Sequence, residues 1–279
     1  MLVALARIVI VVALLVLALR ISRWPEGLFY FPSREPFDTP PGVRDVTFTA
    51  SDGVKLHGWL MLPPGASAEA PVPAVLHVHG NAGNISSHAA FSDFLPDAGI
   101  AVLVFDYRSY GRSDIAPGRL RREALLEDTR AAWDELKAQP EVDGQRLGIY
   151  GVSIGGTFAA ALAAEAPDAK CLCLVAPFET WPRIAGTHMP VIGPLLITPG
   201  LDPAQSVRGL GSRPLLVVHG GDDTIVPPAH GRAVVDAAAG AGVHAEFAII
   251  AGAGHNDVVV DEPAGRAAVS GFFRTTLGR

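Results

Sequence analysis

The sequence predicts an α/β fold in which a mostly parallel central sheet carries helices on both faces. Six short apolar runs are typical of strands buried on both faces, and helical stretches separate these runs. Strands that alternate with helices favour right-handed βαβ units, and therefore a parallel sheet. A chain of 279 residues with 49% hydrophobic side chains is long enough to bury the core of one such domain.

The first two strands are expected to form an antiparallel hairpin. "RDVTFTA" at 44–50 and "VKLHGWLML" at 54–62 alternate around the turn "SDG". The other predicted strands lie at 73–79, 100–106, 146–152, 171–177, 214–220 and 245–250. The predicted helices lie at 86–99, 120–140, 154–167, 228–242 and 262–277.

Two intervals do not follow this alternation of strands and helices. The stretch from about 178 to 212 is rich in Pro and Gly and too long for a simple connection, which is typical of a lid or binding loop. We expect it to be a short cap insertion within one domain spanning 44–279. Residues 24–43, rich in Pro and aromatic residues, are expected to form an extended connector against the domain or the membrane interface.

The N-terminal segment differs in kind from the rest of the chain. Residues 2–19 form an apolar run interrupted only by Arg7, close to the length at which a helix spans hydrocarbon. We expect residues 1–23 to be an uncleaved membrane anchor. A signal peptide, with secretion after cleavage, is the alternative, although no clear small-x-small cleavage site follows. Arg7 on one side and Arg20 and Arg23 on the other leave the orientation in the membrane open.

Composition and cysteine usage exclude several classes of function. The formal net charge is −6 and no cluster of Lys and Arg is present, so nucleic-acid binding is not expected. Cys171 and Cys173, two residues apart on a predicted strand, have poor geometry for a disulfide and are expected to be reduced core residues. No metal or other cofactor is expected.

The predicted strand at 146–152 leads into "GVSIGG", which places Ser153 between glycines at the start of an alanine-rich helix. In a G-x-S-x-G turn the serine is strained, while Gly151 and Gly155 let strand and helix approach closely, and Gly156 adds further space. Ligands of parallel sheets bind beyond the carboxyl ends of the strands, where this hydroxyl would lie. We therefore predict that Ser153 is a nucleophile rather than a small residue in a turn.

The predicted strand at 73–79 leads into "HVHGNAGN", a turn suited to binding negative charge. The backbone N–H groups of Asn81 and Ile154 are predicted to stabilise the oxyanion of a tetrahedral intermediate. His79 is expected to shape this loop through a hydrogen bond. A metal site at His77 and His79 is disfavoured because no further ligands follow at useful spacing.

Two later strand ends supply the remaining candidate groups. "VVHGGDDTIVPP" offers Asp222 and Asp223 as a carboxylate that could orient an imidazole. "AGAGHNDVV" places His255 in a glycine-flanked loop, where its imidazole could take the serine proton and return it to the leaving group. Asn256 or Asp257 is expected to cap the last helix.

Across residues 37–279 the sequence resembles the α/β-hydrolase family, especially membrane-anchored members of the acylglycerol lipase, lysophospholipase and depalmitoylase type. The resemblance rests on "HGNAGN", "DYRSYGRSD", "GVSIGG", "HGGDDTIVP" and "GAGHND", in the family's order of nucleophile, acid and histidine. It implies that Asp223, the fourth residue after the histidine of "HGxxDxxVP", is the acid. Ser109 stands where the family usually has glycine and Ile154 where leucine is common; neither change removes a catalytic group.

These observations together predict a serine hydrolase with Ser153 as nucleophile, His255 as general base and acid, and Asp223 as orienting carboxylate. The predicted anchor and the apolar stretch 189–199 favour small-molecule acyl esters or thioesters, lipid-like in character, cleaved through an acyl-enzyme. A peptidase or amidase on the same scaffold is one alternative. A non-catalytic, membrane-tethered binding protein is another.

Other charged residues are assigned structural roles. Asp106 and Arg108 are expected to stabilise the loop after the strand at 100–106 through buried, charge-assisted hydrogen bonds. Five histidines have no partner that the sequence identifies and are expected to be structural or exposed: His57, His88, His188, His230 and His244.

Overall fold

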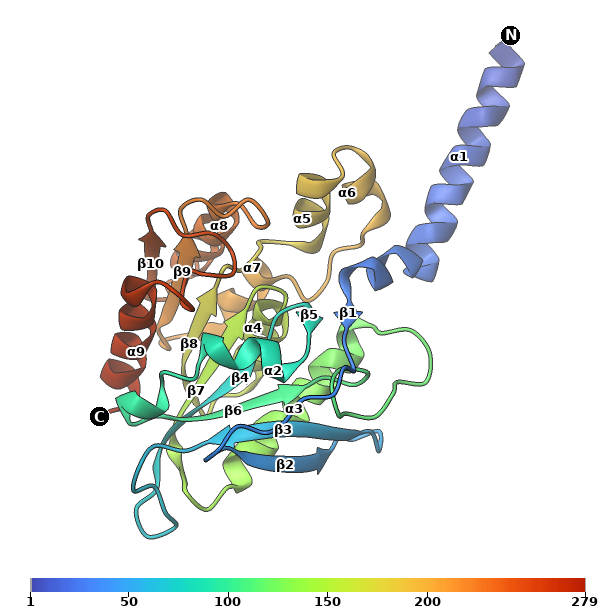
Figure 1. The fold of residues 1–279 in the computed structure, drawn as a ribbon. Helices are drawn as coiled ribbons and strands as arrows, with labels where there is room; N and C mark the ends of the chain where they lie inside the picture. The colour runs from blue at the N-terminus through green and yellow to red at the C-terminus, as the bar shows by residue number, and fades with distance from the viewer. Residues whose placement is uncertain (1, 279) are drawn as a thin grey trace.

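The computed structural model describes residues 2–278 around an eight-stranded sheet of order β10-β9-β8-β7-β4-β6-β3-β2 (Figure 1). The strands are β2 Arg44–Thr49, β3 Lys55–Met61, β4 Val72–Val78, β6 Ala101–Asp106, β7 Val142–Val152, β8 Ala169–Val175, β9 Leu215–Gly220 and β10 Ala245–Ile250. β3 pairs antiparallel with β2 and β6, and the other neighbours in this sheet pair parallel. The predicted fold class, including the antiparallel hairpin, is confirmed.

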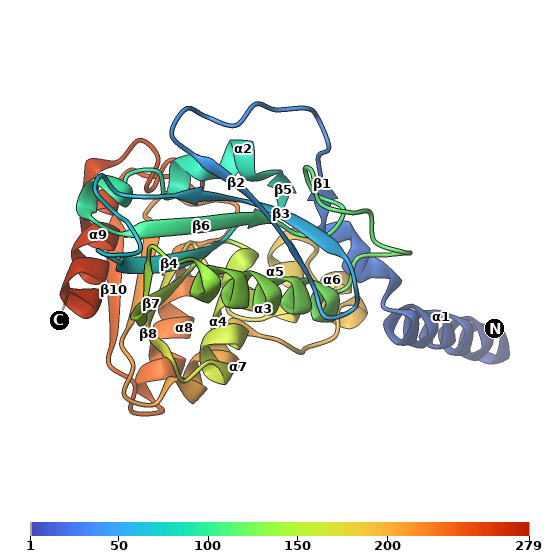
Figure 2. The same ribbon diagram turned by 90° about the horizontal axis from the view of Figure 1, so that it is seen from below.

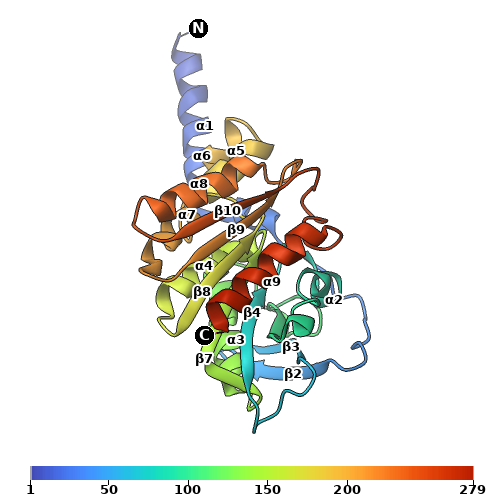
Figure 3. The ribbon, with the colours of Figure 1, turned by 90° about the vertical axis from the view of Figure 1, so that its left-hand side faces the viewer.

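Helices cover both faces of the sheet (Figures 2 and 3). Helices α3 Arg122–Ala138, α4 Gly155–Glu165 and α8 Pro228–Ala239 pack on one face, and α9 Pro263–Leu277 packs on the other. Successive side chains of a strand therefore enter different cores: in β7, Ile149 belongs to one hydrophobic cluster and Tyr150 to the other. Burial on both faces explains why the central strands are continuous apolar runs.

The predicted helix at 86–99 is wrong in extent. The segment contains the short helix α2 Ile85–His88 and two 3₁₀ turns, Ala89–Phe91 and Pro96–Ala98. Pro96 cannot donate the backbone hydrogen bond that a continuing helix needs, and Gly99 follows in the left-handed region with φ 80°. The chain therefore turns here instead of continuing as a helix.

The insertion between β8 and β9 forms a small helical cap above the carboxyl ends of the strands (Figure 1). Helices α5 Trp181–His188 and α6 Ile192–Leu196 form the part above the strands, whereas α7 Pro203–Ser206 and the 3₁₀ turn Val207–Leu210 pack beside α4 and α8. Trp181 and Ile184 bury one side of α5 against the domain, whereas the turn into α6 leaves Val191 and Ile192 exposed. The cap thus has one face packed on the domain and a solvent-exposed apolar tip, formed by the turn into α6 and by α6 itself.

Helix α1, Leu2–Ser22, projects away from the domain (Figures 1 and 2). Its segment Ala4–Ser22 has a mean hydropathy of 2.6 and is unburied, and it is long and apolar enough to cross a membrane. Such a helix fits an anchor or a signal sequence. The next residues are not simply extended: the 3₁₀ helix η1, Trp24–Phe29, precedes strand β1, Phe31–Pro32, which pairs parallel with β5, Ala82–Gly83.

Candidate active site

Ser153 lies in a sharp turn between β7 and α4 with φ 53°, a left-handed conformation that is strained for a serine. The turn depends on its glycines. A Cβ at Gly151 would overlap Ala159 and Gly156, and one at Gly155 would overlap the backbone carbonyls of Val78 and His79. A Cβ at Gly156 would meet nothing closer than 3.4 Å, so the extra space expected there is not needed.

The loops that follow β7, β9 and β10 bring three residues that are distant in sequence into one hydrogen-bonded chain. His255 Nε2 lies 3.0 Å from Ser153 Oγ, and His255 Nδ1 lies 2.7 Å from Asp223 Oδ2. Ser153 follows β7, Asp223 follows β9 and His255 follows β10, all at the carboxyl edge of the sheet. An imidazole in this position can accept the hydroxyl proton on one nitrogen while its other N–H donates to a carboxylate.

Asp223 is held in place by several donors. Its Oδ1 accepts the backbone N–H groups of Ile225 (2.9 Å) and Val226 (2.8 Å). Burial alone would raise the pKa of this carboxyl, but hydrogen bonds from His219 and His255, the charge of His255 and the Val226 N–H hold that pKa well below its usual range. The carboxylate therefore stays ionised beside His255.

Asp222, the competing candidate, is exposed; its backbone N–H donates to Ala253 O at 2.9 Å. His219, which the sequence analysis did not single out, is buried in β9 beside the acid. Its Nε2 lies 2.7 Å from Val226 O and 3.3 Å from Asp223 Oδ2. The "HGGDD" spacing, which puts His219 four residues before Asp223, is the signal that could have identified it.

The loop of His255 corrects another expectation. Asp257 does not cap the last helix, since α9 begins at Pro263 with Glu262 as its N-cap residue. Asp257 Oδ1 instead accepts the backbone N–H of Gly254 at 2.6 Å, directly before His255. The side chain therefore stabilises the turn that presents the imidazole.

The predicted oxyanion donors lie on both sides of the serine. The residues Asn81, Ser153 and Ile154 line one cavity, and the hydrogen bonds of residues 2–278 include none donated by the Asn81 or Ile154 backbone N–H. Tyr110 Oη donates to Asn81 O at 2.6 Å, which fixes this loop. His79 is buried with its Nδ1 2.7 Å from Gly80 O, in agreement with the expected loop-shaping role.

The cavity beside Ser153 has a volume of about 390 Å³ and an apolar wall. Part of that wall comes from the cap, through Ile184, Ala185, His188 and Met189. Another part comes from the segment after α1, through Leu28, Phe29 and Phe31, which the sequence analysis treated only as a connector. The aromatic residues of that segment were the available signal, but nothing local indicates that they would reach Ser153.

The remaining predicted groups lie outside this cavity. Arg108 makes the expected buried, charge-assisted hydrogen bonds, and its partner is Asp128, Nη2 to Oδ1 at 2.7 Å; it also contacts Asp52. Asp106 is not part of that pair; it accepts the backbone N–H of Ile85 at 2.9 Å. Cys171 and Cys173 are free and buried, and burial raises the pKa of Cys171 to about 12. Residues 2–278 contain no group of three His, Cys, Asp or Glu side chains able to hold a metal ion.

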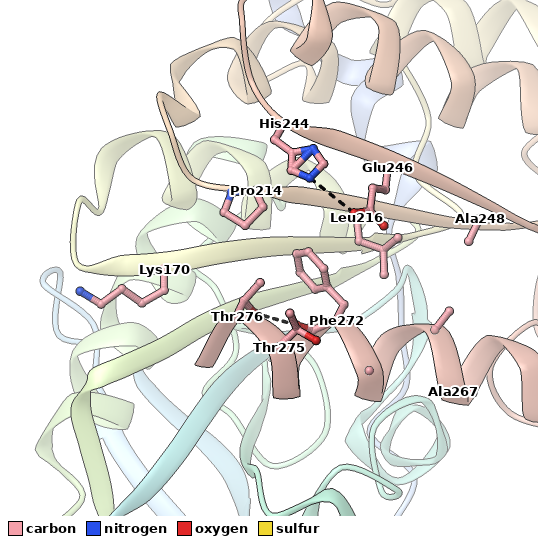
Figure 4. A pocket seen from close by; sticks show the side chains of 12 residues that line it. Lys170, Pro214, Leu216, His244, Glu246, Ala248, Ala267, Phe272, Thr275 and Thr276 are labelled. Carbon is pink, nitrogen blue, oxygen red and sulfur yellow. Dashed lines mark hydrogen bonds and ion pairs between the residues drawn. The ribbon is translucent and has the colours of Figure 1, made fainter. Parts of the chain in front are cut away.

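A second hollow lies on the face of the sheet that α9 covers, between β8, β9, β10 and α9 (Figure 4). Its ionisable side chains include His244, directly before β10, and Glu246 on β10; both are exposed, and His244 Nε2 lies 3.5 Å from Glu246 Oε1. The side-chain hydrogen bonds and ion pairs of residues 2–278 link neither residue to the loops that carry Ser153, Asp223 and His255. The nucleophile, imidazole and carboxylate arrangement is found at the first cavity.

Relatives of known sequence cover most of the chain. The protein Rv2307c of Mycobacterium tuberculosis is 35% identical over 258 residues, 90% of this chain and 88% of that protein. Protein bem46 of Schizosaccharomyces pombe is 29% identical, covering 74% of this chain and 69% of its own length. A family model described as serine aminopeptidase, S33, matches residues 69–198.

Solved structures share the fold. The esterase Pf2001 of Pyrococcus furiosus superposes with a TM-score of 0.74 at 21% identity, covering 90% of this chain and 98% of that one. The acylaminoacyl peptidase of Pyrococcus horikoshii gives a TM-score of 0.64 at 17% identity, covering 84% of this chain and 41% of that one. Sequence relatives, family model and fold agree: the chain belongs to the α/β-hydrolase family of hydrolases.

Proposed function

We propose that this protein is a serine hydrolase that cleaves carboxylic esters of acyl chains through an acyl-enzyme on Ser153. The observation that carries the proposal is the pair of distances at one imidazole, 3.0 Å from Nε2 to Ser153 Oγ and 2.7 Å from Nδ1 to Asp223 Oδ2. A serine hydroxyl is a weak nucleophile at neutral pH and needs an adjacent base of this kind.

In the acylation step, His255 Nε2 accepts the proton of Ser153 Oγ as that oxygen attacks the ester carbonyl carbon. The carbonyl oxygen becomes an oxyanion, which the N–H groups of Asn81 and Ile154 stabilise. When the intermediate collapses, the bond to the leaving group breaks and its oxygen takes the proton from Nε2. Water then attacks the acyl-enzyme by the same route, which releases the acid and returns the proton to Ser153 Oγ.

The cavity wall favours an acyl chain over a peptide N-terminus. Its lining is mostly apolar, and none of the described residues that line it is a carboxylate. An aminopeptidase needs a group that binds the substrate's ammonium ion, because a buried unpaired charge is costly. An ester with an apolar acyl chain, or the corresponding thioester, meets no such requirement.

We further propose that α1 is retained as a membrane anchor and that residues 44–279 form the hydrolase domain. The apolar, unburied span Ala4–Ser22 supports the anchor. The segment between them contributes Leu28, Phe29 and Phe31 to the cavity, whether or not α1 is retained. N-terminal sequencing of the mature protein tests this assignment; a sequence beginning near Arg20 would contradict it.

The proposed activity is tested by labelling wild-type and Ser153→Ala proteins with a fluorophosphonate probe. The same proteins are assayed with p-nitrophenyl esters of increasing acyl length. We expect labelling and turnover only in the wild type. A folded wild-type protein that neither labels nor hydrolyses any of the esters would refute the proposal and favour a binding protein.

A further inference from the structure

Exposed apolar side chains are concentrated at the mouth of the Ser153 cavity. Outside α1, ten large hydrophobic side chains of the described residues are exposed, and eight of them belong to η1, β1, the cap tip or the Asp223 loop. We call these eight the mouth surface: Trp24, Leu28, Phe31, Met189, Val191, Ile192, Leu195 and Ile225. Four of the eight also line the cavity, so the mouth surface and the cavity wall are continuous.

One residue of the mouth surface, Val191, is both highly exposed and in an unfavourable backbone conformation. Val191 is 77% exposed and has φ 70°, a left-handed conformation that a β-branched residue rarely adopts. Glycine or asparagine would suit this turn better. An exposed valine in a strained turn gains nothing from packing within the protein, so its apolar character points to a partner outside the chain.

The mouth surface lies directly beside α1. Helix α6 contacts α1, and Arg20 Nη1 donates to Leu195 O at 3.1 Å. Two views show the cap alongside the C-terminal part of α1 rather than behind the domain (Figures 1 and 3). The unburied apolar surface of α1 and the mouth surface therefore lie side by side.

A buried polar network fixes this arrangement. Glu26, in η1 directly after α1, lies 3.1 Å from Arg122 Nε. The Arg122 guanidinium also donates to the carbonyls of Thr198 and Gly200, at the base of the cap. The segment that follows α1 and the base of the cap thus bind the same side chain, that of Arg122. A bilayer that holds α1 therefore also positions the cap tip.

We propose that the mouth surface docks onto the lipid bilayer, so that the Ser153 cavity opens toward the acyl chains and takes its substrates from the membrane. The substrate class is amphiphilic acyl esters that reside in the bilayer. Apolar side chains enter the interfacial region, Trp24 occupies the level that tryptophan prefers, and Arg20 faces anionic headgroups. The inference rests on the proposed function of the cavity.

Membrane contact is measured directly on the full-length protein in vesicles of phosphatidylcholine and phosphatidylglycerol. Ile192→Cys is labelled with an NBD fluorophore, and Ile249→Cys on edge strand β10 is the matched control; both isoleucines are exposed. Cys171 and Cys173 are buried and escape labelling in the folded protein. We expect lipids with brominated acyl chains to quench position 192 strongly and position 249 weakly. Equal quenching at the two positions would overturn the inference.

Substrate entry is measured with two esters that share a leaving group. We expect Ile192→Glu to lower hydrolysis of p-nitrophenyl palmitate dissolved in the bilayer by about fivefold or more, and to leave p-nitrophenyl acetate hydrolysis unchanged. Ile192→Leu should restore the palmitate rate. Equal loss with both esters would overturn the inference. Failure of the wild type to hydrolyse either ester would instead refute the proposed function, and the quenching result would still report docking.

Discussion

Glu26 and Arg122, 96 positions apart in the chain, form an ion pair in which both side chains are almost fully buried, at 3% and 1% exposure. Burial alone would raise the pKa of Glu26, but its hydrogen bonds and charge interaction with Arg122 lower that pKa overall. Glu26 also pairs with Arg23, Oε2 to Nη2 at 2.6 Å, whereas the ion pairs of residues 2–278 give Arg122 only Glu26 as a counter-charge.

Removing one partner of this pair should be costly. We predict that Glu26→Ala lowers the free energy of unfolding by about 3–5 kcal/mol, because Arg122 is left as an unpaired buried charge. The measurement is urea unfolding in detergent, followed by tryptophan fluorescence. Glu123→Ala is the control: Glu123 pairs with Arg23 at the surface, 58% exposed, and should cost no more than about 1 kcal/mol. Similar costs for the two variants would contradict the assignment of Glu26 as a buried structural charge.

Adjacent aspartates provide a sharp test of the proposed mechanism. We predict that Asp223→Asn lowers kcat for p-nitrophenyl butyrate by about 10⁴, because the amide no longer holds His255 in the required tautomer. Asp222→Asn, one residue earlier and exposed, should leave kcat within about twofold of the wild type, since surface substitutions of this kind have small effects. Circular dichroism checks that both variants fold. Comparable losses of kcat in the two variants would count against Asp223 as the orienting group.

The strand ends explain how far the sequence could predict the site. Ser153, Asp223 and His255 each follow a buried apolar strand, and parallel strands bring their carboxyl ends to one edge. Local patterns therefore nominate Ser153 and His255, but they leave Asp222 and Asp223 as alternatives, between which the family resemblance decides. The apolar runs likewise predict the order of strand and helix. Local pattern fails at 86–99, where Pro96 divides the predicted helix.

The cavity wall could not be predicted in the same way. Phe29 and Phe31 reach Ser153 because Glu26 anchors their segment to Arg122, and no local pattern marks Glu26 as buried. Asp257 was assigned to the wrong turn for a related reason: an Asp before a helix resembles a cap, and only the path of the loop shows that it bonds Gly254. Contacts between segments distant in sequence decide both cases.

The two glycines after Ser153 are predicted to differ in their tolerance of a methyl group. At Gly155 a Cβ would overlap the carbonyls of Val78 and His79, and would push the Asn81 loop away from Ser153. We expect Gly155→Ala to cost about 1–3 kcal/mol of stability and about 10²-fold in kcat. At Gly156 a Cβ makes only ordinary contact with Pro177, at 3.4 Å.

Gly156→Ala is therefore the matched control, and the higher helix propensity of alanine should leave its stability equal to or above that of the wild type. The same unfolding and p-nitrophenyl butyrate assays compare the two variants. A Gly155→Ala protein with wild-type kcat would show that the β4 loop can move without affecting the reaction, which would remove the Asn81 N–H from the proposed mechanism.

His230 makes the attachment of the cap sensitive to pH. The backbone N–H of Glu179 donates to His230 Nδ1 at 3.3 Å, and Nε2 lies 3.1 Å from the Thr187 hydroxyl, so α8 binds the cap at two points. Burial, followed by the charges of Arg183, His219 and His188, lowers the pKa of His230 from 6.5 to about 4, while Asp223 opposes the shift. A proton on Nδ1 would displace the Glu179 N–H.

Between pH 6.5 and about 4 the unfolded chain binds this proton more readily than the folded chain, so the free energy of unfolding falls as pH decreases through that window. Burial lowers the pKa values of His77, His79 and His88 as well, and these histidines contribute to the same dependence of stability on pH.

We predict that His230→Gln reduces the loss of stability between pH 7 and pH 4.5 by about 1–2 kcal/mol, measured by urea unfolding at the two pH values. His244→Gln, at a position 70% exposed, is the control and should keep the wild-type slope. If the His230→Gln slope also matches the wild type, the cap is not held by a neutral imidazole.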